Sequence, residues 1–126
     1  MYKKIVASLL LFGILTTILA ACAIYDESAV SGPTVHMGAA NFVQSTITIN
    51  KGDSLTLVDD VGVQHILKNG SWQGAKQVPA TESGAPTVNL TFNGGDSASA
   101  GPFNTAGQFH IFCTIHPGMN LTITVH

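Results

Sequence analysis

Three side chains that bind metals well lie within seven residues near the end of the 126-residue chain. Cys113 offers a thiol, His116 an imidazole and Met119 a thioether, in the order Cys-x-x-His-x-x-Met. Sulfur ligands suit Cu(I), whereas imidazole also suits Cu(II). A ligand set that is a compromise between the two oxidation states changes little when an electron arrives or leaves. The spacing therefore predicts a site for one copper ion that carries single electrons.

A second imidazole has to come from another part of the chain, and His65 is the candidate that we favour. It lies on an earlier expected strand, which a sheet can bring beside Cys113. The rivals are His36 and His110. Strand alternation places the side chain of His110 on the opposite face of its strand from that of Cys113. For His36, no neighbouring strand is expected that would bring it to the ligand loop.

Each of these side chains also has a purely structural interpretation. Cys113 could be a small buried hydrophobe, and Met119 could be core packing at the start of a strand. Gln64, which precedes His65, could supply an axial oxygen. Its side chain should point to the opposite face of the strand from His65, so Met119 remains the preferred axial ligand. Trp72 is expected to plug a loop or the edge of the core.

The segments around these residues have the pattern of β-strands. Polar and apolar residues alternate with the period of two that is typical of half-buried strands, and no long segment has a period of 3.6. Strands are expected at residues 35–38, 46–49, 54–59, 63–68, 88–92, 108–113 and 121–125. Short strands separated by turns predict an all-β sandwich or barrel. The connection 69–87 is long and could hold a short helix or a further strand, and 93–106 is also long.

The N-terminus has the pattern of an export signal. Lys3 and Lys4 precede a mostly apolar run at 5–19, which ends in Ala20-Ala21-Cys22. The small-small-Cys ending resembles the lipobox of bacterial lipoproteins, which implies cleavage after residue 21 and lipid attachment to Cys22. An uncleaved membrane helix is the alternative, although the run is barely long enough. Either interpretation predicts an exported protein, with residues 22–33 as a flexible tether and 34–126 as the domain.

Charge and cysteine content narrow the function further. Without residues 1–21 the chain keeps three Lys, no Arg and seven acidic residues, a net charge of −4. Such a surface repels phosphate backbones, so nucleic-acid binding is not expected. If Cys22 carries lipid, Cys113 has no disulfide partner, and metal ligation would protect its thiol from oxidation. Asp59 and Asp60 are expected to form a solvated hairpin tip.

The complete ligand pattern resembles the cupredoxins, the type 1 blue copper proteins. Cys113-x-x-His116-x-x-Met119 before a final strand, with His65 well upstream, is similar to their ligand set, and the short loop is similar to that of amicyanin and plastocyanin. The resemblance implies a Greek-key β-sandwich of about eight strands over residues 34–126. It also implies that His65, Cys113 and His116 are strong equatorial ligands and Met119 a weak axial ligand. One departure is Ile66, which stands where the family often has an Asn that ties the two ligand segments together.

The resemblance also implies how electrons would enter and leave. They would pass at the solvent-facing edge of His116, through a patch that includes Pro117, Gly118, Val61 and Val63. The expected partners are redox proteins at the membrane, and the carrier is expected to be a monomer. An enzyme is not expected, because five His residues without a His-x-His pair do not supply further copper centres. A copper chaperone or store is the alternative function.

Overall fold

The computed structural model describes residues 32–126 of the chain. The predicted export signal, Cys22 and nearly all of the tether lie outside the described residues. The described part contains nine strands: β1 (Thr34–Met37), β2 (Thr46–Ile49), β3 (Leu55–Asp59), β4 (His65–Gln73), β5 (Lys76–Pro79), β6 (Asn89–Phe92), β7 (Ser97–Ala100), β8 (Gly107–Cys113) and β9 (Asn120–Val125). Among residues 32–126 there is no helix that could cross a bilayer.

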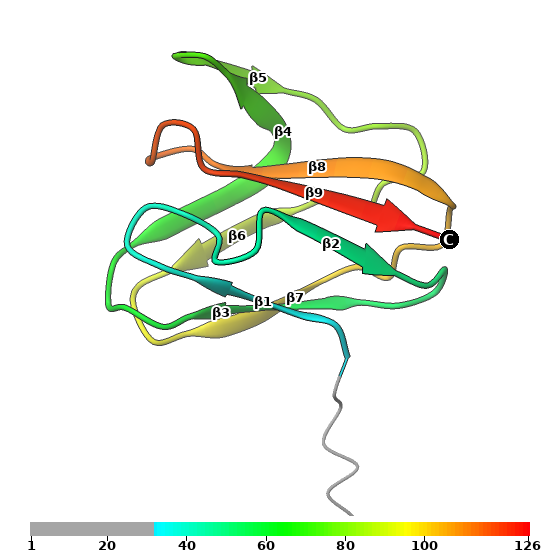
Figure 1. Ribbon diagram of the computed structural model, residues 1–126, viewed down its shortest axis with the longest axis horizontal. Helices are drawn as coiled ribbons and strands as arrows, with labels where there is room; N and C mark the ends of the chain where they lie inside the picture. Colours follow the sequence, from blue (N-terminus) through cyan, green and yellow to red (C-terminus); the bar gives the residue numbers. More distant parts are fainter. Residues whose placement is uncertain (1–31) are drawn as a thin grey trace, which may run out of the picture.

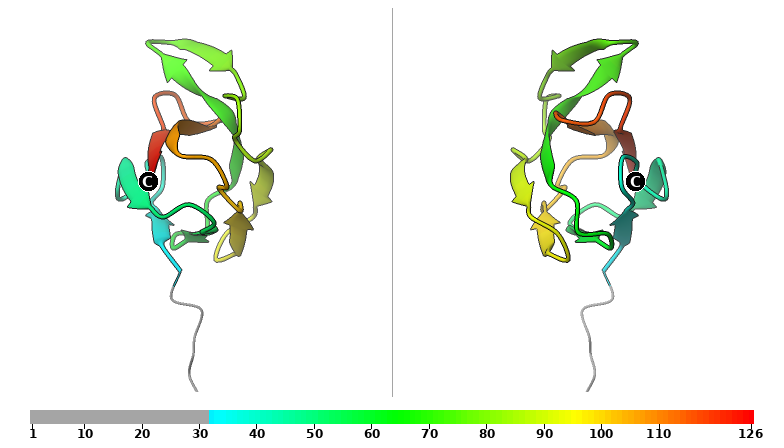
Figure 2. Two further views of the ribbon diagram at one scale, coloured as in Figure 1. Left: turned by 90° about the vertical axis from the view of Figure 1, so that its right-hand side faces the viewer. Right: turned by 90° about the vertical axis from the view of Figure 1, so that its left-hand side faces the viewer.

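The strands form two sheets that pack as a sandwich (Figure 1). One sheet has the order β1-β3-β7, and the other runs β2-β9-β8-β4-β5 with β6 also paired to β4. β1 pairs with β3 and β2 with β9 in parallel, and the other pairs are antiparallel. Viewed from either end (Figure 2), the strands surround a central region, and the buried hydrophobic side chains fill it. The prediction of an all-β sandwich is confirmed.

Side-chain alternation places the core between the sheets. In β9, Leu121, Ile123 and Val125 are buried, whereas the threonines between them are half-buried. Burying each such aliphatic side chain contributes about 1.5–3 kcal/mol. The same alternation in β3 turns Leu55, Leu57 and then Asp59 inward.

The position of Asp59 corrects one expectation from the sequence. Its side chain is 0% exposed, so it does not belong to a solvated hairpin tip. Its neighbour Asp60 is about half exposed and does lie at the surface, where a carboxylate oxygen is 2.9 Å from Nδ1 of His36. The strand ends at Asp59, and only the following residue enters the turn.

The two strands without a clear sequence signal lie in the two long connections. β7 pairs with β3 through Ser97–Ala100, a segment with no large apolar side chain. β5 pairs with the second half of β4 and forms a hairpin of residues 70–79. The hairpin extends beyond the body of the sandwich, at the top of Figure 1.

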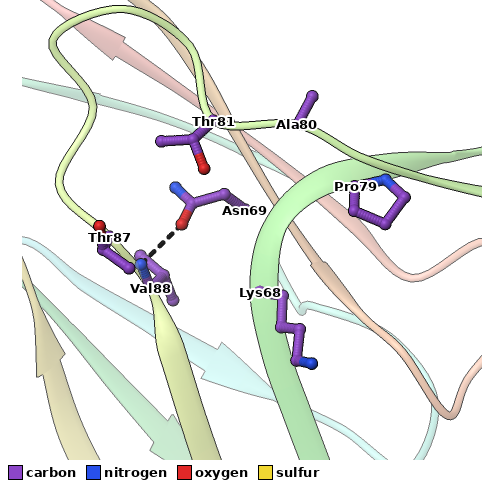
Figure 3. Close-up of a pocket in the computed structure, with 7 residues that line it drawn as sticks. All are labelled: Lys68, Asn69, Pro79, Ala80, Thr81, Thr87 and Val88. Carbon is purple, nitrogen blue, oxygen red and sulfur yellow. Dashed lines mark hydrogen bonds between the residues drawn. The ribbon is translucent and has the colours of Figure 1, made fainter.

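A sharp change of direction at Gly70 makes this hairpin possible. Gly70 has φ +123°, and a Cβ there would lie 2.4 Å from the carbonyl oxygen of Val78. Beside it, the amide of Asn69 donates to the carbonyl of Pro86 at 3.0 Å and accepts from the N–H of Val88 at 2.6 Å. These bonds fix the connection from β5 to β6 beside a pocket of about 310 Å³ (Figure 3).

Replacing Gly70 should test this constraint. Gly70→Ala is expected to lower the free energy of unfolding by about 3 kcal/mol, because it adds backbone strain and a clash with the β5 backbone. Gly74→Ala is the matched control, since Gly74 also has positive φ (+59°) but nothing lies within 4 Å of an added Cβ; its cost should be about 1 kcal/mol. Equal losses for the two variants in urea unfolding would contradict the proposed close approach at Gly70.

Candidate metal centre

The loop between β8 and β9 is closed by hydrogen bonds in its own backbone. The N–H of Cys113 donates to the carbonyl of Met119 at 3.0 Å, and the N–H of Met119 donates to the carbonyl of His116 at 3.2 Å. Gly118 has φ +77°, a conformation that few other residues adopt easily. The antiparallel strands β8 and β9 hold the two ends of the loop. Cys113, His116 and Met119 are therefore carried on a constrained turn.

The register of β4 against β8 brings His65 to this loop. Leu67 pairs with Cys113 in the antiparallel ladder. His65 precedes Leu67 by two residues and so faces the same side, one step further toward the loop. Nδ1 of His65 lies 3.8 Å from Sγ of Cys113, and Nδ1 of His116 lies 3.4 Å from the same sulfur. The structure thus brings together three of the four predicted ligands.

The geometry of these donors fits a single metal ion. One ligand atom from each of His65, Cys113 and His116 lies within 4.8 Å of the other two. Donors that share an ion at bond lengths of about 2.0–2.3 Å stand roughly 3.5–4 Å apart. One thiolate and two imidazoles form the trigonal donor set that suits copper in an electron-transfer site.

Burial keeps His65 in the form that can bind a metal. The ring is fully buried, and loss of hydration lowers its pKa below the ordinary value of 6.5. The neighbouring ring of His116, whose centroid is 4.8 Å away, lowers the pKa further, while Asp59 acts in the opposite direction. The imidazole of His65 is therefore held neutral near pH 7, with a lone pair available.

A buried carboxylate that sequence reasoning placed in solvent stands behind His65. Oδ1 of Asp59 lies 3.8 Å from Nε2 of His65, the ring nitrogen that faces away from the sulfur. Within the described residues, neither Nε2 of His65 nor Oδ2 of Asp59 has a hydrogen-bond partner. The other oxygen of Asp59 accepts from the N–H of Val61, but burying a carboxylate with one oxygen unsatisfied is still costly. A cation bound to Nδ1 of His65 would offset that cost. The two atoms without partners, Nε2 of His65 and Oδ2 of Asp59, therefore fit a metal site.

The other residues considered from sequence lie where strand alternation places them. His110 pairs with Glu82 at 2.6 Å on the outer side of β8, and His36 pairs with Asp60. Neither belongs to the cluster. Gln64 donates to the side chain of Asn93 at 3.2 Å. Met119 is 2% exposed, in the loop that carries Cys113 and His116.

The surface patch through which electrons are expected to pass lies on the loops at the end of the sandwich that carries the ligand loop. His116 and Val63 are half-buried, and Val61, Pro117 and Gly118 are exposed. Sequence reasoning missed two further exposed apolar residues, Val43 and Ile115. Both are on connections that gather at the end of the sandwich where the ligand loop lies, at the left of Figure 1.

Comparison with known proteins identifies the family. The sequence profile described as "Copper binding proteins, plastocyanin/azurin family" matches residues 31–126. The chain belongs to this family. Its members, the cupredoxins, bind one copper ion and transfer electrons. No curated protein sequence matches this cupredoxin.

Solved structures of other cupredoxins share the fold. The reduced state of an amicyanin mutant has a TM-score of 0.59 and 17% identity, covering 79% of this chain and 87% of that one. Amicyanin from Paracoccus versutus has a TM-score of 0.58 and 18% identity, covering 76% and 82%. A purple cupredoxin from Nitrosopumilus maritimus has a TM-score of 0.56 and 19% identity, covering 75% and 99%. At these identities the likeness shows the fold alone.

The charge of Asp59 should affect the reduction potential of the copper-loaded protein. Asp59→Asn keeps an oxygen that can accept from the N–H of Val61, a bond of 3.2 Å, but removes the buried negative charge. That charge favours Cu(II) over Cu(I), so its removal should raise the reduction potential by on the order of tens of millivolts in voltammetry. Asp60→Asn is the control, because solvent screens the exposed Asp60 and the potential should move much less. Equal shifts for both variants would refute a specific effect of Asp59.

Proposed function

We propose that this cupredoxin is a one-electron carrier with a type 1 mononuclear copper site. His65, Cys113 and His116 are its equatorial ligands and Met119 is its weak axial ligand. The observation that carries the proposal is the group of one sulfur and two imidazoles within 4.8 Å of one another, on a loop closed by its own hydrogen bonds. Copper bound there would supply the change between Cu(I) and Cu(II).

The chain's own residues account for the choice of carrier over enzyme. All four proposed ligands come from the protein, so no position is left for a substrate. Cys113 and His65 are completely buried, which excludes water from the sulfur and from the first imidazole. His116 is half-buried and supplies the one proposed ligand ring with an edge toward solvent. A closed site with one exposed edge suits electron transfer and offers little for bond chemistry.

The surface around His116 supports docking of redox partner proteins. Val61, Ile115 and Val43 are the large hydrophobic residues exposed within the described part of the chain, at 39%, 41% and 63%. All three lie on connections at the metal end. Ile115, Pro117 and Gly118 flank His116 in the ligand loop, and with Val61 and Val63 they offer apolar surface through which we expect a partner to approach its ring.

We also propose that the protein is an exported lipoprotein on the outer face of a bacterial membrane, anchored through Cys22. The pattern of residues 1–22 supports this proposal. β1 begins at Thr34 and runs toward the metal end, where the next connection starts (Figure 1). An anchor attached before Thr34 would therefore leave the metal end free to meet a partner. A monomer suits such a tethered carrier.

Copper loading tests the carrier directly. Residues 33–126 with added Cu(II) should show an intense visible thiolate-to-copper band and reversible one-electron voltammetry. Cys113→Ser should abolish the band, because the charge transfer originates on the thiolate. Met119→Leu should keep the band and raise the potential by roughly 100 mV, since loss of the axial sulfur favours Cu(I). A visible band that survives in Cys113→Ser would refute the ligand assignment, and a pale complex with irreversible voltammetry would favour a copper store.

Mass analysis of the N-terminus tests the anchor. The protein isolated from membranes of a bacterial host should begin at Cys22 and carry the mass of attached acyl chains. Cys22→Ala is the control, and it should lack both the cleavage after residue 21 and the added mass. A chain that begins at Met1 in both proteins would show an uncleaved N-terminal segment and contradict the lipoprotein proposal.

A further inference from the structure

The β4–β5 hairpin, residues 70–79, covers the outer side of β8 where the ligand loop begins. Phe112 is fully buried, yet it lies outside the core cluster between the sheets. The ring of Trp72 stands edge-on against it, with centroids 6.2 Å apart and planes at 90°. Phe112 directly precedes Cys113, so the hairpin packs beside the proposed thiolate ligand without belonging to the site itself.

Two side chains of the hairpin donate hydrogen bonds to the first two carbonyls of the ligand segment. The indole N–H of Trp72 donates to the carbonyl of Cys113 at 2.7 Å. The side-chain amide of Gln77 donates to the carbonyl of Thr114, also at 2.7 Å. Both carbonyls lie where β8 ends and the loop begins. An indole has one polar group and can only donate, so its direction is informative.

The same hairpin is bonded to the far end of the ligand loop. The side chain of Asn120, the first residue of β9, accepts from the backbone N–H of Trp72 at 2.7 Å and donates to its carbonyl at 3.1 Å. Trp72 is therefore connected to the residue before the loop and to the residue after it. Three side chains, two from the hairpin and one from β9, join the hairpin to a span of eight residues.

We propose that Trp72, supported by Gln77, is the positioning residue for the thiolate of Cys113. The backbone N–H of Cys113 is held by Met119 and its carbonyl by Trp72. With both groups fixed, the direction of its Cα–Cβ bond is fixed, and Sγ keeps only rotation about that bond. A sulfur that stays in place in both oxidation states keeps reorganisation small. The proposal rests on the electron-carrier function but concerns residues outside the ligand set.

The hydrogen bonding of Ile66 shows why such support is needed. The backbone carbonyl of Ile66 accepts from the N–H of Thr114 at 2.8 Å, so the two ligand segments are joined there by the main chain. The apolar side chain of Ile66 can add no hydrogen bond. The side-chain bonds to this part of the loop come from the hairpin instead.

Two variants and a control test whether the hairpin positions the thiolate of Cys113 or is only attached to the ligand loop. Trp72→Phe removes the indole donor and keeps an aromatic ring against Phe112. Gln77→Met removes the second donor at similar volume and serves if Trp72→Phe does not fold. Gln73→Ala is the control, since Gln73 is an exposed hairpin residue whose side chain makes no hydrogen bond within residues 32–126.

The first measurement is amide hydrogen exchange on the full-length copper-free protein in detergent. Exchange at the N–H groups of Cys113, Thr114 and Met119 should be about fivefold faster in Trp72→Phe and Gln77→Met, the factor that corresponds to one hydrogen bond of about 1 kcal/mol. Gln73→Ala should match the parent protein. Unchanged exchange in both donor variants would overturn the proposal. This result does not depend on copper, so it tests whether the hairpin restrains the ligand loop even if the carrier function is wrong.

The second measurement is made on the copper-loaded full-length protein. If Trp72 positions the sulfur, both donor variants should change the copper hyperfine splitting in electron paramagnetic resonance and should lose copper to a chelator about fivefold faster. The control should do neither. Faster amide exchange with an unchanged copper spectrum in both variants would show that the hairpin is only attached to the loop, and would overturn the positioning role.

Discussion

The antiparallel register between β4 and β8 is the constraint on which the rest of the site depends. Leu67 lies opposite Cys113, and this pairing sets His65 on the inner face beside the start of the ligand loop, where β6 also pairs with it. Because side chains alternate with a period of two, a slip of one residue would turn His65 outward and Leu67 away from the core. The buried apolar residues of β4 and β8 therefore hold the metal centre in register as well as the fold.

The same inward alternation explains why polar groups are buried at one end of an apolar core. Leu55 and Leu57 face inward from β3, and Asp59 follows on that face at the strand's end, behind His65. One oxygen of this carboxylate accepts from the N–H of Val61, but the other has no hydrogen-bond partner within residues 32–126, so burying the group costs free energy. Because the carboxylate lies on the far side of a ligand ring, positive charge bound on the near side would lower that cost. The carboxylate thus links the stability of this end of the fold to occupancy of the metal centre.

Much of this arrangement could be predicted from the sequence, because it depends on local patterns. Alternation in segments such as Thr46–Ile49 located the strands with large apolar residues, and the Cys113 loop carried its own spacing. β7 could not be predicted, since Ser97–Ala100 offers only small side chains. The inward direction of Asp59 was implied by Leu55 and Leu57, but the adjacent turn made a solvated tip the simpler interpretation. The contact of Trp72 with Cys113 depends on the bend at Gly70, which no local pattern indicates.

β4 supplies two different elements, and Gly70 separates them. Its first half carries His65 in the large sheet, and its second half carries Trp72 in the hairpin that bonds to Cys113. Both halves of β4 therefore contact the same place, the end of β8 at Cys113. Any displacement of β4 along β8 would move the imidazole and the indole together relative to the sulfur, and it would break the Leu67–Cys113 pairing at the same time. One strand with a single glycine bend thus couples the position of the ligand His65 to the hydrogen-bond support of the ligand Cys113.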